Sequence, residues 1–149
     1  MKRIIFLVLV VCWTMVVTAR AQNGKPEPKE VVLAFYRLAL VDLHPKEAFD
    51  RYGATDFLEH SSDTSGNTRE SAVGFLTDMI QHAPHPKWEI IRSIAEGDMV
   101  FLHVRFTPAD GAPPVVIGEI FRVQNGKIAE HWDIVQPPKE RATNPTSPF

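Results

Sequence analysis

The sequence predicts an α+β domain in which about three amino-terminal helices pack on a curved antiparallel sheet. Two observations predict this fold class. Apolar residues recur at helical spacing through the first half of the chain, and from Lys87 onward they alternate with polar residues, as in strands. Helices followed by a meander of strands are typical of a two-layer fold, and ligand sites favour the junction of such layers. We therefore expect a cone-shaped domain with a cavity between the helices and the sheet.

Three helices are expected before the strands. Proline is tolerated in the first turn of a helix, and prolines precede or open the first two helices. The third helix has a buried stripe of apolar residues and ends where two prolines follow. The segment from Thr55 to His60 is expected only as a short stretch ahead of a polar loop. The expected helical ranges are Pro26 to about Val41, Pro45 to Gly53, and Thr68 to Pro84.

Four strands are expected in the second half of the domain. Each combines alternating polarity with a polar or glycine-containing turn at its end. Consecutive strands with such short turns form antiparallel pairs. The expected ranges are 88–95, 99–107, 115–123 and 128–135.

The amino-terminal segment is predicted to direct export. Residues 1–21 combine a basic start, an apolar run from Ile4 to Val17 and an A-x-A pattern that ends at Ala21. The run is shorter than the roughly 20 apolar residues that cross a bilayer. We therefore expect a secretory signal peptide cleaved after Ala21, a secreted or periplasmic protein, and no membrane attachment after cleavage.

The rest of the chain divides into one domain and a tail. Residues 22–136 carry the helix and strand patterns, and their length suits a single domain. Residues 137–149 are rich in proline and polar residues, so we expect a disordered tail.

Composition excludes several classes of function. Cleavage removes the only cysteine, Cys12, together with three basic residues, so the mature chain has no thiol and is more acidic than the formal charge of −2 of the whole chain. A mildly acidic chain without a basic stripe is a poor partner for nucleic acid. No H-x-H, HExxH, phosphate-loop or GxGxxG pattern occurs, so we predict no metal and no cofactor.

Several phrases of the sequence resemble the SnoaL-like branch of the nuclear transport factor 2-like superfamily. The phrases are EIFR from Glu119, NGKI from Asn125, EHWD from Glu130, and FLEH, which ends at His60. A turn like Ala95 to Asp98, followed by a strand with His103, also occurs in this group. The resemblance covers roughly Lys29 to Gln136.

The resemblance implies the nuclear transport factor 2-like fold and one small-molecule pocket. Members include polyketide cyclases that perform intramolecular aldol chemistry, ketosteroid isomerases, dehydratases, epoxide hydrolases and non-catalytic binding domains. The chain departs from the usual pattern at Glu119, where the family has an aspartate, and at Ser61, where it has an asparagine. Both departures weaken the transfer of chemistry to single residues.

The turn between the last two strands decides which side chains share a face. A three-residue loop places Glu119 opposite His131, whereas a two-residue type I′ turn at Asn125-Gly126 places Glu119 opposite Trp132. Asn-Gly favours the second geometry, and the family resemblance favours the first, which we adopt. One face then carries Ile117, Glu119, Phe121, Ala129, His131, Asp133 and Val135.

An apolar face with three titratable groups is typical of a ligand cavity with a few placed polar groups. Aldol closure or a double-bond shift needs a base beside an acidic C–H and a donor for the enolate oxygen. We expect Asp133 or His131 as the base and a protonated Glu119 as the donor. His60 and His103 are expected at the mouth or wall of the pocket, with Phe121 and Val135 in its apolar lining.

Three functions from different classes stay open. The first is a cofactor-independent enzyme that performs acid–base chemistry on a small, mostly apolar carbonyl compound. The second is a binding protein without turnover. The third is an interaction domain that forms a homodimer through the outer sheet face, which carries Ile120, Arg122, Ile128, Glu130, Trp132 and Ile134.

Overall fold

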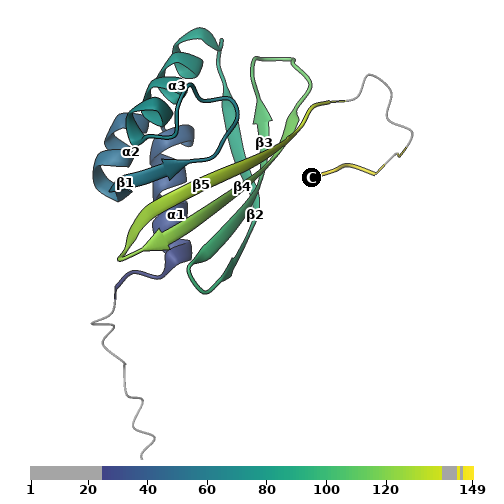
Figure 1. The fold of residues 1–149 in the computed structure, drawn as a ribbon. Coiled ribbons are helices and arrows are strands. Elements are labelled where there is room, and N and C mark those ends of the chain that lie inside the picture. Colours follow the sequence, from purple (N-terminus) through teal and green to yellow (C-terminus); the bar gives the residue numbers. More distant parts are fainter. Residues whose placement is uncertain (1–24, 139–143, 145) are drawn as a thin grey trace, which may run out of the picture.

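The computed structural model describes residues 25–138, 144 and 146–149, so the predicted signal peptide lies outside the described residues. The described chain forms helices and one five-stranded sheet (Figure 1). Its elements are α1 (Pro28–Tyr36), the π-helical turn η1 (Arg37–Val41), α2 (Pro45–Tyr52), β1 (Gly53–Glu59), α3 (Arg69–His82), β2 (Lys87–Glu96), β3 (Met99–Thr107), β4 (Val115–Gln124) and β5 (Lys127–Gln136). Among these residues, none of the helices has both the length and the apolar character needed to cross a membrane.

The three helices begin where local chemistry favours a start. Pro28 and Pro45 occupy the first turns of α1 and α2, where a missing N–H leaves no hydrogen bond unmade. α3 begins with a reciprocal capping box, in which the Thr68 hydroxyl accepts from the backbone N–H of Ser71 and the Ser71 hydroxyl accepts from that of Thr68. The prediction of three helices is confirmed, but α3 follows β1, so the helices do not all precede the strands.

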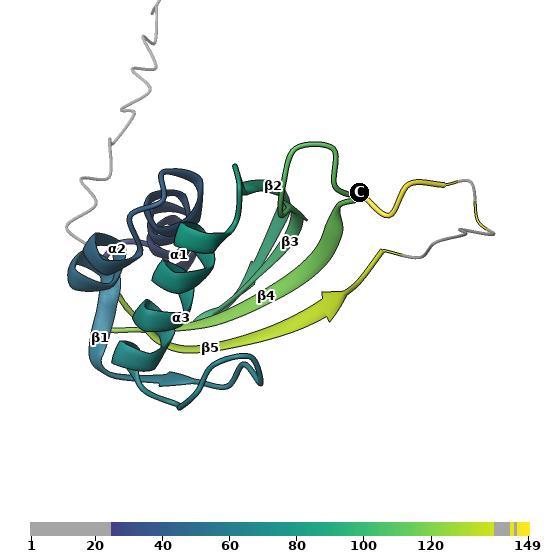
Figure 2. The ribbon, with the colours of Figure 1, turned by 90° about the horizontal axis from the view of Figure 1, so that it is seen from above.

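The helices lie together in the concave side of the curved sheet (Figure 2). Buried aromatic rings join the two layers: Phe35 of α1 meets Phe121 of β4 edge-on at 5.9 Å between centroids, and Phe49 of α2 meets Phe57 of β1 at 5.1 Å. Such edge-to-face pairs add about 0.5–1.5 kcal/mol each beyond the burial of their area. The α+β fold class is therefore confirmed, and the remaining space between the layers forms the cavity described below.

The sheet contains one strand that the sequence pattern did not predict. The strand order is β1-β5-β4-β3-β2, in which β2 to β5 form the expected antiparallel meander and β1 pairs parallel to β5. The segment expected only as a short stretch from Thr55 to His60 is thus largely strand. It was missed because it follows α2 without a turn and its partner is distant in sequence, whereas the pattern analysis detects only local pairing.

The hairpin between β4 and β5 combines the tight turn with a bulge. Asn125 (φ 54°) and Gly126 (φ 78°) form a two-residue connection with both residues left-handed, as in a type I′ turn. The predicted three-residue loop is therefore wrong. Next to the turn, Val123 pairs with Ile128 but Arg122 pairs with Glu130, so one extra residue, Ala129, is inserted in β5.

The bulge restores the face that the three-residue loop was expected to produce. Beyond Ala129 the register places Glu119 opposite Asp133, and Phe121 opposite His131. Glu119 therefore shares a face with His131 and Asp133, although its direct partner across the strands is Asp133 and not His131. The two-residue turn alone would have placed His131 and Asp133 on the face opposite to Glu119. The inserted residue Ala129 reverses the alternation of side chains in β5 and brings them back to the face of Glu119.

Candidate active site

A cavity of about 240 Å³ lies between the helices and the sheet. Its walls are mainly apolar and aromatic side chains from α1, α2, α3 and the inner face of the sheet, among them the predicted Phe121 and Val135. The polar side chains that line it include Tyr36, Glu59, Ser61, Asp63, Thr64, Glu119, His131 and Asp133. An apolar hollow with a few polar groups is the usual form of a small-molecule site.

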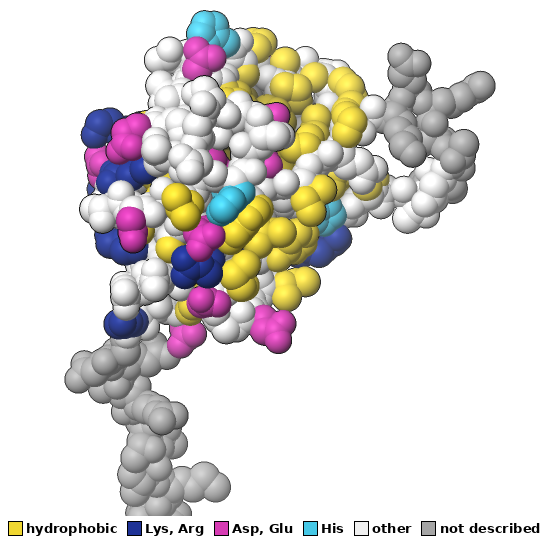
Figure 3. All heavy atoms as spheres, in the orientation of Figure 1, with side chains coloured by type: hydrophobic (Ala, Val, Ile, Leu, Met, Phe, Trp, Pro, Cys, Tyr) yellow, Lys and Arg dark blue, Asp and Glu magenta, His cyan; other side chains and the backbone are white. Residues whose placement is uncertain are grey.

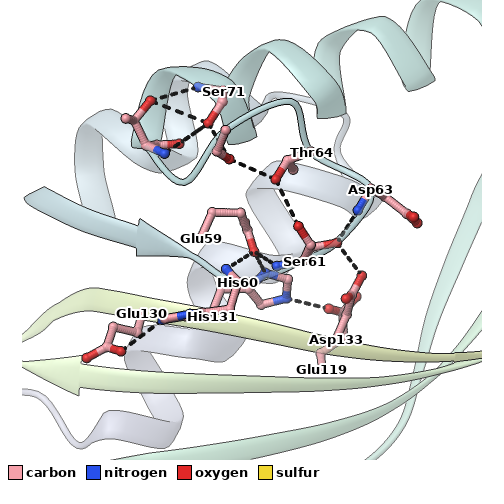
Figure 4. A network of polar contacts seen from close by, with 12 residues as sticks. Glu59, His60, Ser61, Asp63, Thr64, Ser71, Glu119, Glu130, His131 and Asp133 are labelled. Carbon is pink, nitrogen blue, oxygen red and sulfur yellow. Dashed lines mark hydrogen bonds and ion pairs between the residues drawn. The ribbon is translucent and has the colours of Figure 1, made fainter.

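His131 is clamped between two carboxylates (Figure 4). Its Nδ1 lies 2.8 Å from an oxygen of Glu59, and its Nε2 lies 2.7 Å from an oxygen of Glu119. Only 14% of the His131 side chain is exposed, and the two carboxylates are more deeply buried. The short contacts on both nitrogens indicate that both carry a proton and donate.

The charge of His131 follows from these contacts. Burial by itself lowers the pKa of the imidazole, but the hydrogen bonds and negative charges of Glu119 and Glu59 outweigh it and raise the pKa to about 10. His131 is therefore an imidazolium at neutral pH. It cannot serve as the base there, because a base needs a free lone pair, so of the two predicted bases Asp133 remains.

Glu119 accepts on both oxygens. The Tyr36 hydroxyl donates to one of them at 2.8 Å, and His131 donates to the other at 2.7 Å. Burial and then the charge of Glu119 raise the pKa of Tyr36 well above its usual value, so Tyr36 stays a donor. These contacts give Glu119 the role of an acceptor and do not support the expected protonated donor, because neither oxygen is left free to aim a proton at a ligand.

Glu59 is the site residue that sequence analysis missed. β1 places Glu59 beside His131 in the parallel register, and one oxygen of Glu59 also accepts the backbone N–H groups of His60 (3.0 Å) and Ser61 (2.9 Å). The signal available in the sequence was the alternation of Phe57 and Glu59, which both point inward. It becomes informative only if residues 53–59 are recognised as a strand.

Asp133 faces the cavity without such a clamp. Burial, followed by the nearby charges of Glu119 and Asp63, raises its pKa, and these effects outweigh the hydrogen bond from Ser61 and the charge of His131. The Ser61 hydroxyl donates to Asp133 at 3.0 Å and accepts from the backbone N–H of Asp63 at 3.3 Å (Figure 4). A raised pKa moves a carboxyl from its usual acidic range toward the pH range in which general bases and acids work best.

The two other predicted pocket histidines are not in the cavity lining. His60 stacks on Trp132 on the outer face of the sheet, with 4.5 Å between ring centroids, and its Nε2 lies 3.1 Å from Glu130. His60 is therefore at neither the mouth nor the wall of the pocket. Side chains of successive residues in a strand point to opposite faces, so the residue after the inward Glu59 points outward.

His103 also lies on the outer face. Its Nδ1 is 2.7 Å from Arg92, and burial and then the charge of Arg92 lower its pKa. It pairs across the strands with Gly118, one residue from the inward Glu119, which explains why the expected position in the wall fails. The ring of Phe149, in the tail, stacks near His103 at 6.1 Å.

The polar network is complete within the described residues. No buried side-chain nitrogen or oxygen there lacks a hydrogen-bond partner, and no group of three or more His, Cys, Asp or Glu side chains is arranged to hold a metal ion. The arrangement offers one buried positive charge, on His131, and one carboxyl with a raised pKa, that of Asp133, beside an apolar space.

The comparison with protein families decides the relationship. Residues 32–131 match the family model of the SnoaL-like domain. The chain belongs to the SnoaL-like family. No curated protein sequence matches this SnoaL-like chain.

Solved structures share the fold of this SnoaL-like protein at low sequence identity. IdmH, a candidate polyketide cyclase from Streptomyces antibioticus, is 20% identical, with a TM-score of 0.61 over 74% of this chain and 92% of its own. AclR, a candidate hydroxylase from Streptomyces galilaeus, is 18% identical, with a TM-score of 0.62 over 76% of this chain and 91% of its own. A nuclear transport factor 2-like protein of unknown function from Cytophaga hutchinsonii is 15% identical, with a TM-score of 0.61 over 77% of this chain and 95% of its own.

These similarities show the fold and leave the reaction open, because one fold can host several chemistries. The reaction of this SnoaL-like domain depends on the side chains that line its own cavity.

Proposed function

We propose that the protein is a cofactor-independent acid–base catalyst that acts on a small, mostly apolar carbonyl compound. One observation carries the proposal: Asp133, with its raised pKa, lines an apolar cavity beside the imidazolium of His131. Intramolecular aldol cyclisation, double-bond isomerisation and dehydration all begin when a base removes a proton next to a carbonyl group. The family and the candidate polyketide cyclase among its structural neighbours support this class.

In the proposed reaction, ionised Asp133 removes the C–H proton and, once protonated, returns it to the product. The positive charge of His131 stabilises the negative charge that develops on the substrate oxygen. This stabilisation is mainly coulombic, because both N–H groups of His131 already donate to Glu59 and Glu119.

The test uses a probe that needs only a base in an apolar site. 5-Nitrobenzisoxazole opens to a coloured phenolate when one C–H proton is removed. We expect Asp133→Asn to lower the rate about 100-fold or more, the usual contribution of a general base. The matched control is Asp56→Asn, because Asp56 is an exposed aspartate on β1 that does not line the cavity.

The pH dependence adds a second criterion. The rate should rise as Asp133 ionises and fall again near pH 10, where His131 loses its proton. An Asp133→Asn variant that keeps the parental rate would contradict the proposal. A folded parent that accelerates the probe no more than free acetate would favour the alternative of a ligand-binding protein without turnover.

A second candidate function is pairing with another copy of the chain through the outer sheet face. Hydrophobic side chains gather over β4 and β5 on the face seen in Figure 3, and Ile134 is 66% exposed there. Exposed apolar patches of this kind favour association. Light scattering after size-exclusion chromatography should give a dimer for the parent and a monomer for Ile134→Asp, whereas a monomeric parent would contradict the pairing.

Export is also part of the proposal and is supported by the pattern of residues 1–21. Mass spectrometry of the protein recovered from the periplasm or medium of an expressing bacterium should find a mature chain that begins at Gln22. A protein that stays in the cytoplasm with its first residues intact would contradict export.

A further inference from the structure

The cavity carries an excess of negative charge. Four of its lining residues are carboxylic acids, one is the imidazolium of His131, and none is lysine or arginine. Glu59 and Glu119 share the single positive charge of His131 between them. The remaining acids are Asp63 and Asp133, and within the described part of the chain neither forms an ion pair with a basic side chain.

These two acids are neighbours in the cavity lining, because the charge of Asp63 is one of the effects that raise the pKa of Asp133. The Ser61 hydroxyl contacts both residues, since it donates to the Asp133 carboxylate and accepts from the Asp63 backbone N–H. Asp63 is exposed, so it lies at the rim, and Asp133 is half-buried behind it. A cation that enters the cavity would therefore meet two uncompensated carboxylates, and an anion would be repelled by them.

The aromatic side chains of the cavity are suited to the same kind of ligand. Phe35, Phe57, Trp88, Phe106 and Phe121 all line the cavity. Aromatic rings bury an apolar body, and their faces attract a positive charge within about 6 Å. The aromatic walls of the cavity thus favour the same class of ligand as its negative charge does.

We propose that the cavity binds a small molecule with an apolar body about the size of one aromatic ring and a basic amine, held as an ammonium beside Asp63 and Asp133, and that it rejects carboxylates. As a statement about the substrate, this inference rests on the proposed function: the substrate would be an amine-bearing carbonyl compound. As a statement about binding, it rests on the cavity alone.

Three probes of nearly equal size test the inference. They are 4-phenylbutylamine, 4-phenylbutan-1-ol and 4-phenylbutanoate, which are cationic, neutral and anionic at pH 7.5. Titration calorimetry should show that the amine binds about tenfold more tightly than the alcohol, and the carboxylate about tenfold more weakly than the alcohol, as expected for one partly solvated charge contact of each sign.

Variants identify the acids that produce the preference for the amine. Asp63→Asn, at the exposed rim, should reduce the preference for the amine over the alcohol several-fold without disturbing the fold, and Asp63→Asn combined with Asp133→Asn should abolish it. Asp56→Asn, at an exposed site outside the cavity, should leave the preference unchanged. Equal affinity for amine and alcohol, a carboxylate that binds as well as the alcohol, or no binding of any probe would overturn the inference.

The two proposals fail separately. An amine preference without proton removal from 5-nitrobenzisoxazole would leave the binding inference in place and reject the catalytic function. Base catalysis that depends on Asp133, without a preference for the amine, would support the catalytic function and reject the binding inference.

Discussion

Replacing His131 with glutamine removes the one positive charge between two buried carboxylates. The pKa of His131 is raised from its usual 6.5 to about 10, and only 14% of the side chain is exposed, so solvent screens the interaction little. At about 1.4 kcal/mol for each pH unit between the two values, the proton on His131 stabilises the fold by on the order of 5 kcal/mol. That is a large share of the about 5–15 kcal/mol that is typical of a domain.

The sign of the pH dependence follows from the direction of the pKa change. A group with a raised pKa in the folded state stabilises the fold fully below its unfolded pKa, and the stabilisation is lost as pH rises through the folded pKa. For His131 it is therefore complete below about pH 6.5 and lost near pH 10. The difference in the free energy of unfolding between the parent and His131→Gln should therefore shrink by about 1.4 kcal/mol per pH unit between about pH 7 and 9.5.

Urea denaturation at half-unit steps of pH measures this difference directly. His82→Gln is the matched control, because 74% of the His82 side chain is exposed and its replacement leaves no buried charge without a partner; its free energy of unfolding should stay close to that of the parent. Parallel curves for the parent and His131→Gln would refute the reasoning, since they would mean that the imidazole carries no extra proton in the folded state.

Three further predictions concern the stability of the fold. Tyr36→Phe should lower the free energy of unfolding by about 2 kcal/mol in urea, because a buried carboxylate loses its hydroxyl donor, and an unchanged midpoint would contradict this. Asp133→Asn should raise the melting temperature more at pH 8 than at about pH 4, the usual pKa of an aspartate. The reason is that a raised pKa makes the ionisation of Asp133 destabilise the fold as pH rises above that value; an equal effect at both pH values would argue against it. Gly53→Ala should lower the free energy of unfolding by about 1–3 kcal/mol in urea, because the added methyl group would lie 2.8 Å from the Phe49 carbonyl oxygen. Its control is Gly74→Ala in helix α3, where an added methyl group would meet nothing within 4 Å; this change should be neutral or raise the free energy of unfolding by up to about 1 kcal/mol.

The site was partly predictable because alternation along a strand is a local property. Once residues 128–135 are assigned as a strand, His131 and Asp133 must share a face, whatever the rest of the chain does. Glu119 joined them in the prediction through a turn that proved wrong, and a bulge at Ala129 made the conclusion right. No local pattern in the sequence marks that bulge. Whether a strand accepts an inserted residue depends on whether the neighbouring strand and the helices packed on it accommodate the extra twist.

Sequence by itself determined the helices, the four-stranded meander, the family and the shared face of His131 and Asp133, since these follow from periodicities of a few residues or from phrases along the chain. Only the tertiary structure decided that β1 pairs parallel to β5 and brings Glu59 to His131 across 72 residues. It likewise decided the charge of His131, because a pKa depends on which distant groups approach within hydrogen-bonding distance and on how far water is excluded. Such contacts depend on how helices and strands pack against one another, and no local sequence pattern specifies that packing.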